Sequence, residues 1–154
     1  MLVRQVMITD VVSVHEDDLI SVVLKKMIDH RIGIIPVLDS KDRLSGVITD
    51  GDIMRTLLPK QMTVYDWYSL IASVKVEITR GHLEDLLNKK VSKLMRKRNI
   101  LTVTAERDLG DVLRMLSHHH LKRVPVIDRE HHVVGLIGRS DVLRYLGEQV
   151  LGEV

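Results

Sequence analysis

The sequence predicts an α/β protein built from two β-α-β-β-α repeats that pack as a pseudo-twofold pair, with a helical connecting segment between them. The main observation is a duplication, because four pairs of residues recur at one common spacing of 89 positions without a gap. The second observation is that the same order of strand and helix patterns follows in both halves. The matched pairs are Pro36 and Pro125, Asp39 and Asp128, Gly46 and Gly135, and Asp52 and Asp141.

The composition is that of an ordinary folded protein. The chain has 154 residues, of which 45% are hydrophobic, and we expect its two halves to share one core. A net charge of +2 indicates no general nucleic-acid or membrane surface, and the absence of cysteine excludes disulfides. The first residues lack the apolar stretch of a signal peptide. These features favour a soluble, cytoplasmic protein.

Each repeat is expected to open with a short strand and an amphipathic helix. The strands are expected at 11–14 and 100–104, and the polar stretch after each of them suits a helix start. Four apolar residues then follow at helical spacing, which predicts one buried face for each helix. They are Ile20, Val23, Leu24 and Met27 in the first half, and Leu109, Val112, Leu113 and Leu116 in the second.

A hairpin and a second helix complete each repeat. Segments 34–38 and 124–127 predict short buried strands, in which a proline belongs on a sheet edge or at a bulge. Polar turns lead to third strands at 44–48 and 133–137, each with a glycine at the same depth. Such a glycine indicates that something approaches the strand backbone closely. The second helices are expected to begin near Asp52 and Asp141.

We divide the chain into a first repeat at 1–58, a helical connector at 59–90 and a second repeat at 91–154. The connector is expected to hold two helices that are separated near Gly81. Its aromatic residues indicate either a helix packed over the edge of the pair or an exposed patch for a second copy or a partner. These aromatic residues are Tyr65, Trp67 and Tyr68.

The motifs of both halves together resemble a known family. An apolar Pro-Val segment ends at an aspartate in each half, and Gly-Val-Ile-Thr-Asp-Gly-Asp follows in the first half at 46–52. This set closely resembles the cystathionine β-synthase (CBS) domain, here as a tandem pair or Bateman module, over about residues 1–58 and 91–149. The resemblance implies a disk-like pair with two grooves for adenosine-containing ligands (AMP, ADP, ATP, S-adenosylmethionine, sometimes NAD). It also implies regulation of an attached or partner protein.

The residues at the strand–helix junctions suit such a ligand. Thr49 ends a strand, and its hydroxyl can hydrogen-bond a phosphate or ribose oxygen. Asp52 and Asp141 lie in first helical turns, where a carboxylate on the groove surface can accept both ribose hydroxyls. The alternative role for these residues is that of ordinary helix caps.

An adenine base needs an apolar slot with backbone groups at its edge. Strand backbone near Val12 and Ile32 is expected to provide this slot, and by resemblance Leu101 and Leu121 take the same roles in the second repeat. The full set of candidate ligand-binding residues is Val12, Ser13, Arg31, Ile32, Gly33, Thr49, Asp52, Leu101, Thr102, Leu121, Lys122, Arg123, Arg139 and Asp141.

The repeats differ where a phosphate is expected. The first repeat has two carboxylates in its junction motif and only Arg31 nearby, whereas the second is rich in basic residues. Gly138 departs from the family's Thr or Ser, which removes a hydroxyl, and Arg139 can compensate because a guanidinium binds phosphate oxygens as a fork. By resemblance, a ligand held by one repeat sends its phosphates toward the other, so the sequence leaves the choice of groove open.

Metal binding and catalysis find no support in the sequence. The histidines at 118–120 are adjacent, so they point in different directions and lack a partner at ligand spacing. There is no cysteine, no Gly-x-Ser-x-Gly elbow and no Walker loop. We therefore expect a non-enzymatic regulatory module that binds an adenine nucleotide or S-adenosylmethionine and forms a homodimer. The alternatives are a dimerisation or interaction scaffold without a ligand, and a subunit of an enzyme with a separate catalytic chain.

Overall fold

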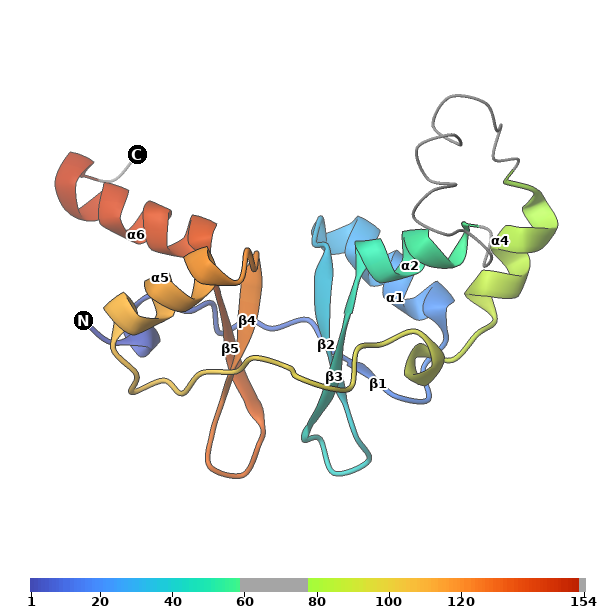
Figure 1. Cartoon of the computed structure of the whole chain (residues 1–154), viewed down its shortest axis with the longest axis horizontal. Coiled ribbons are helices and arrows are strands. Elements are labelled where there is room, and N and C mark those ends of the chain that lie inside the picture. Colours follow the sequence, from blue (N-terminus) through green and yellow to red (C-terminus); the bar gives the residue numbers. More distant parts are fainter. Residues whose placement is uncertain (59–77, 153–154) are drawn as a thin grey trace.

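The computed structural model describes residues 1–58 and 78–152, which form two α/β halves side by side (Figure 1). The first half has a three-stranded sheet in the order β1-β2-β3, and the second has a two-stranded sheet of β4 and β5. In Figure 1 the labelled α-helices of both halves lie toward the upper side, and both hairpin turns lie on the lower side.

The elements follow the predicted repeat order, so the tandem α/β repeat is confirmed. Up to residue 58 the chain forms the short 3₁₀ helix η1 (Val3–Gln5), then β1 (Val14–His15), α1 (Ile20–His30), β2 (Ile34–Leu38), β3 (Leu44–Thr49) and α2 (Asp50–Thr56). From residue 78 it forms α4 (Arg80–Leu87), the 3₁₀ helix η2 (Val91–Lys93), α5 (Leu109–His118), β4 (Arg123–Ile127), β5 (Val133–Gly138) and α6 (Arg139–Leu151).

The two hairpins have the same register. Pro36 lies opposite Val47 in the antiparallel pair β2–β3, and Pro125 lies opposite Leu136 in β4–β5. Each hairpin also has a register shift that begins one residue after its proline. The spacing of 89 positions therefore aligns the two hairpins residue for residue.

The two prolines cost their sheets no hydrogen bond. Pro36 is in the middle strand, next to the register shift between Val37 and Leu38, and β1 pairs only with these two residues. In the second half, Val103 donates its N–H to the carbonyl of Pro125 at 3.1 Å and accepts from Ile127 at 2.9 Å. Val103 bonds only to the carbonyl of Pro125 and to the N–H of Ile127, so the N–H group that proline lacks is not needed in this pairing.

Most of the buried apolar residues form two clusters, one in each half, so the expectation of a single shared core is wrong. Val47, Ile127 and Leu136 are buried but belong to neither cluster. The physical reason is that each hairpin packs one face against the helix of its own half. This contact covers the apolar face of that helix, so none of it is left to join the two halves. Ile20 and Val23 on α1 meet Ile48 in the first cluster. Val112 and Leu116 on α5 play the same part in the second cluster.

The leading segment of the chain crosses to the second half. Val3 and Val6 are buried in the second cluster. Ile8 then pairs with Leu136 of β5 through backbone hydrogen bonds of 2.8 and 2.9 Å. Figure 1 shows this blue segment leaving the half that contains α5 and α6 and running to the other.

The segment that precedes the second repeat makes the reciprocal crossing. Val91 and Met95 are buried in the first cluster, and Arg96 pairs with Val47 of β3 through backbone hydrogen bonds of 2.8 and 3.1 Å. The yellow trace in Figure 1 then leads to the second half. Each half therefore borrows a strand-like edge from the segment that leads into the other half.

The predicted close approach at the two strand glycines is confirmed, and the approaching backbone is that of the crossing segments. A Cβ atom on Gly46 would lie 2.6 Å from the carbonyl oxygen of Arg96. A Cβ atom on Gly135 would lie 3.0 Å from the carbonyl oxygen of Ile8. Any other residue at Gly46 would push the crossing segment away from β3.

Several elements are shorter than predicted. β1 has two residues, and the strand expected at 100–104 is reduced to one bridge between Val103 and Val126. The second connector helix ends at Leu87 instead of running toward residue 94. The expected first connector helix and its aromatic residues, at 59–77, lie outside the described residues. No helix in the described ranges has the length and apolar character needed to span a bilayer.

Substitution of Gly46 by alanine tests the role of the crossing segment. Because its Cβ would meet the Arg96 carbonyl, Gly46→Ala is expected to lower the free energy of unfolding by about 1–3 kcal/mol. Gly147→Ala is the control, since no atom lies within 4 Å of a Cβ there and alanine favours the helix by about 1 kcal/mol. Urea denaturation of both variants measures the difference. Equal stability of the two variants would contradict the proposed tight crossing.

Candidate functional site

A cavity of about 800 Å³ lies between the two halves. Its wall includes the chain after α1 and after α5, the starts of α2 and α6, and the crossing segment at 96–101. Apolar side chains from β2, β3 and β4 line it as well. Its volume falls within the range of pockets that hold one small molecule.

Nine of the fourteen predicted residues line this cavity, and the structure brings them together from both repeats. They are Arg31, Ile32, Gly33, Thr49, Leu101, Leu121, Lys122, Arg123 and Arg139. The other five do not line it. These are Val12, Ser13, Asp52, Thr102 and Asp141.

The expected adenine slot of the first repeat is used by the protein itself. The ammonium group of Lys26 donates to the carbonyl oxygen of Ser13 at 2.8 Å, so this backbone acceptor already has a strong partner. Val12 is half-buried against the first core cluster. In the second repeat, by contrast, Leu101 and Leu121 pack against the second cluster and also line the cavity.

Asp52 has the alternative role, that of a helix cap. The hydroxyl oxygen of Thr49 accepts from the N–H of Asp52 at 3.2 Å, and the carboxylate accepts from the N–H of Thr49 at 3.0 Å. Asp52 also pairs with Arg55. Thr49 still lines the cavity, and within the described part of the chain its hydroxyl donates to no acceptor. Its hydrogen therefore remains available to a ligand.

Asp141 is buried, so the expectation that both carboxylates lie on the groove surface is wrong for it. Its side chain has no exposed area. The carboxylate caps α6 by accepting from the N–H of Gly138 at 2.9 Å, and it also accepts from Arg123 and Arg144, both at 3.3 Å. A charge at this depth is tolerated because two guanidinium groups and a backbone N–H compensate it. Arg123 is thereby turned toward Asp141 while it lines the cavity.

A close approach by another chain segment explains why position 138 is a glycine. The N–H of Arg139 donates to the carbonyl of Lys122 at 3.3 Å, so the two chain segments nearly touch. A Cβ atom on Gly138 would lie 2.3 Å from that carbonyl oxygen. The first repeat has the same close contact, with Gly33 in the place of Lys122 and Asp50 in the place of Arg139. The carbonyl of Gly33 accepts from the N–H of Asp50 at 2.9 Å, so in this repeat the glycine lies on the other of the two segments. The hydroxyl residue that the family has at position 138 does not fit here.

Eleven further residues of the wall were not among the predicted site residues. Those on the crossing segment lie outside the repeat motifs, so no sequence signal indicated that they face the cavity. The others lie within two positions of a predicted residue, and this closeness in the motif was the available signal. The eleven are Ile34, Val47, Asp50, Arg96, Asn99, Ile100, His119, His120, Val124, Pro125 and Ser140.

The wall of the cavity is strongly basic. Five arginine or lysine side chains line it against a single carboxylate, that of Asp50, although the whole chain carries a net charge of only +2. This concentration of positive charge favours an anionic ligand. The basic residues are Arg31, Arg96, Lys122, Arg123 and Arg139.

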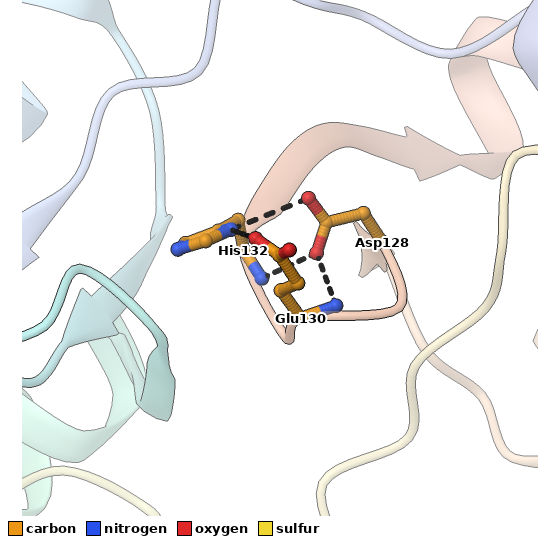
Figure 2. A group of neighbouring side chains, drawn as sticks. All are labelled: Asp128, Glu130 and His132. Carbon is orange, nitrogen blue, oxygen red and sulfur yellow. Dashed lines mark hydrogen bonds and ion pairs between the residues drawn. The ribbon is translucent and has the colours of Figure 1, made fainter.

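A second group of polar residues lies on the turn between β4 and β5, where Figure 2 shows Asp128, Glu130 and His132. Their ligand atoms lie within 4.8 Å of one another, and none of them is among the histidines at 118–120 that the sequence brings to attention as metal ligands. The Nδ1 atom of His132 is 3.3 Å from Asp128. In the first hairpin, Arg43 takes the place of His132 and pairs with Asp39 at 3.1 Å. Because a guanidinium cannot ligate a metal, the shared contact is a feature of the turn.

These turn carboxylates are stabilised in the ionised form. The backbone N–H of His132 is the main cause that lowers the pKa of Asp128, and the N–H of Arg43 does the same for Asp39, in both cases against a smaller effect of burial. A lowered folded-state pKa contributes stability above the unfolded-state pKa. That contribution is lost as the pH falls through the lowered value.

The fold is that of a tandem-repeat module with a cavity between its repeats, and comparison with known proteins assigns its family. The family model described as "CBS domain" matches residues 3–59 and 91–148. The chain therefore belongs to the CBS domain family, with two repeats.

Similar proteins share this architecture over nearly their whole length. The chain is 26% identical over 156 residues to the uncharacterized protein MJ1426 of Methanocaldococcus jannaschii. The matched region covers 95% of this chain and 91% of that relative. The solved CBS domain pair of protein MJ0100, in complex with 5′-methylthioadenosine and S-adenosyl-L-methionine, matches with a TM-score of 0.69 and 22% identity, over 97% of this chain and 98% of that one. CBSX2 in complex with AMP matches with a TM-score of 0.72 and 21% identity, over 96% and 97%. These two structural matches establish the fold alone.

The buried position of Asp141 predicts a cost in stability. Asp141→Ala removes the cap of α6 and two charge-assisted hydrogen bonds, so the free energy of unfolding is expected to fall by about 1–3 kcal/mol. Asp111→Ala is the control, because its half-exposed side chain makes only a long contact of 3.8 Å with Arg114. That variant is expected to stay within about 0.5 kcal/mol of the wild type in urea denaturation. An unchanged stability of Asp141→Ala would mean that the carboxylate serves another purpose.

Proposed function

We propose that the protein is a regulatory module that binds one adenosine-containing ligand in the cavity between its repeats and signals by a change in conformation. The observation that carries this proposal is the cavity itself, which combines apolar walls with a basic rim from both repeats. Its relatives add support, since protein MJ0100 and CBSX2 were solved with adenosine-containing molecules.

The chemistry of the wall suits the parts of such a ligand. The adenine base is assigned to the apolar side chains of the second repeat, where Ile100, Leu101 and Leu121 lie together on the wall. Asp50 and Ser140 offer an acceptor and a hydroxyl to the ribose. This assignment replaces the buried Asp141 by residues that are exposed on the wall. Thr49 donates its free hydroxyl hydrogen to a ligand oxygen.

A ligand in this place contacts both halves at once. It shifts the equilibrium between two arrangements of the halves only by the difference in its affinity for them. Residues from both repeats and from a crossing segment line the cavity, so the separation of the halves changes the contacts available to the ligand. This coupling is the proposed signal to a partner protein.

The proposed module is a homodimer, and helix α6 offers a surface for it. Leu143, Leu146 and Val150 follow at helical spacing, and their exposed fractions are 70%, 40% and 83%. Such an apolar face favours a closed twofold contact with a second copy. The alternative function, an interaction scaffold without a ligand, would use the same face but leaves the basic cavity without a purpose.

Calorimetry and thermal-shift measurements with AMP, ADP, ATP and S-adenosylmethionine test the ligand. A native-state ligand at 100 times its Kd is expected to stabilise the protein by about 2.7 kcal/mol. Leu101→Ala removes part of the apolar wall and is expected to weaken binding by about tenfold. Ile28→Ala, at an exposed site on α1 that does not line the cavity, is the control and keeps the wild-type affinity. If none of these compounds binds, the scaffold function replaces this proposal.

Light scattering tests the proposed homodimer. The wild type is expected to be a dimer at high micromolar concentration, and Leu143→Glu is expected to yield a monomer because it places a charge in the apolar face. Arg129→Glu changes the charge on an exposed turn and serves as the control, with the dimer retained. A monomeric wild type under these conditions would rule out the dimer.

A further inference from the structure

The hairpin turns of the two repeats share their backbone contacts but differ in their side chains. In each turn one aspartate oxygen accepts from the backbone N–H groups two and four residues later, at 2.8 and 3.0 Å in the first turn and at 2.9 Å for both in the second. At these two later positions the first turn has Lys41 and Arg43. The second turn has Glu130 and His132. Two cationic side chains of the first repeat are therefore replaced in the second by two side chains that can ligate a metal ion.

The exchange changes the charge around the second aspartate. In the first turn the guanidinium of Arg43 compensates the aspartate at 3.1 Å. In the second turn the carboxylates of Asp128 and Glu130 both face one imidazole, that of His132 (Figure 2). Arg129 lies between them in the sequence but forms no ion pair with any described residue. Two carboxylates at this spacing repel each other, and a divalent cation between them turns that repulsion into attraction.

The distances around the imidazole suit a metal ion better than a hydrogen bond. The Nδ1 atom of His132 is 3.3 Å from Oδ2 of Asp128 and 3.5 Å from Oε2 of Glu130. One ring nitrogen carries at most one hydrogen, so it can donate to only one of these carboxylates, and both distances exceed the usual N–H···O range of about 2.7–3.2 Å. A tetrahedral Zn²⁺ ion with bonds of about 2.0–2.2 Å holds its ligand atoms about 3.3–3.6 Å apart. The observed distances match that spacing.

Backbone hydrogen bonds hold the aspartate in a ligating position. Its Oδ1 atom accepts from the N–H groups of Glu130 and His132, and its Oδ2 atom is the one that faces the ring. Ligating carboxylates in metal sites are typically fixed by such outer hydrogen bonds. Asp128 and His132 are half-buried, whereas Glu130 is exposed and free to adjust. Water can supply the remaining ligand at this surface position.

We propose that the β4–β5 turn binds one divalent transition-metal ion, best matched by Zn²⁺, through Asp128, Glu130 and the Nδ1 atom of His132. An imidazole among carboxylates favours Zn²⁺ over Mg²⁺, which prefers oxygen ligands in octahedral geometry. The site is separate from the cavity between the repeats, because none of its three residues lines that cavity. It lies beside a contact between the halves, since the carbonyl of His131 accepts from Leu44 at 2.8 Å.

Calorimetry with Zn²⁺, on protein first freed of metal by EDTA, tests the site. The wild type is expected to bind one ion per chain, and to bind Mg²⁺ at least about tenfold more weakly. In NMR spectra the ring of His132 is expected to shift more than that of any other histidine on addition of Zn²⁺. Absence of Zn²⁺ binding, or equal affinities for Zn²⁺ and Mg²⁺, would overturn the inference.

The first turn provides the matched variant. Glu130→Lys combined with His132→Arg gives the second turn the side chains of the first, where the same backbone contacts are kept beside a lysine and an arginine. The unfolding midpoint in EDTA is therefore expected to stay the same, while the affinity for Zn²⁺ falls at least about tenfold. A wild-type affinity in this double variant would overturn the assignment of the ligands.

The reverse exchange is expected to create a second site. Lys41→Glu combined with Arg43→His gives the first turn the side chains of the second, beside an aspartate that is held by the same backbone contacts. Calorimetry is then expected to show two ions per chain. An unchanged stoichiometry in a folded variant would contradict the claim that these three side chains on this turn form a site.

Two further variants exclude the neighbouring histidines. His118→Gln changes the exposed end of α5, and His131→Asn keeps the left-handed backbone at φ of 68°, which asparagine tolerates. Both variants are expected to bind Zn²⁺ as the wild type does. Loss of binding in His118→Gln would assign the ion to the histidines at 118–120 and overturn the inference.

Discussion

The reciprocal crossing of the two leading segments is the constraint on which the rest of this structure depends. Each half has its own buried cluster, and no cluster joins them. What holds the halves together is that each supplies an edge to the sheet of the other, through Ile8 on β5 and Arg96 on β3. The backbone contact from Leu44 to His131, at 2.8 Å, adds a link between the two hairpins. The cavity exists because this arrangement places the segment at 96–101 between the repeats.

The fold could be predicted from the sequence because its signals are local. Helical stripes, hairpin turns and strand glycines repeat at one spacing, and each is set by residues within a few positions. The close approach at Gly46 was predictable for the same reason, although its partner was not. That partner, Arg96, is fifty positions away and lies outside both repeat motifs. The single shared core was a wrong expectation because apolar periodicity tells which face is buried but not which element covers it.

The candidate site was only partly predictable, since its chemistry depends on contacts between distant segments. An aspartate in a first helical turn serves equally well as a cap or as a ligand-binding group in the sequence. The structure distinguishes the two by showing that both oxygens of Asp141 are already engaged. The glycine at 138 looked like a lost hydroxyl, but its cause is the carbonyl of Lys122, sixteen positions earlier in the chain.

Divergence between the repeats has produced one charged cavity from a symmetric frame. Equivalent positions carry Asp50 and Arg139, and Gly33 and Lys122, so the second repeat supplies most of the positive charge. Similar changes in the hairpin turns, such as Arg43 and His132, keep the local contact and leave the cavity untouched. The two repeats can therefore differ in charge at exposed positions while the register of their buried strands stays the same.

The separation of the two cores bears on how the halves can move relative to each other. A change in the angle between the halves requires no repacking of either buried cluster, because neither spans the interface. It acts instead on the crossing segments and on the repulsion among the cavity charges. In the proposed function, the free energy available for such a change is the difference in ligand affinity between the two arrangements of the halves. Two separate cores that are joined by two backbone crossings suit such a change, because neither core has to be rebuilt.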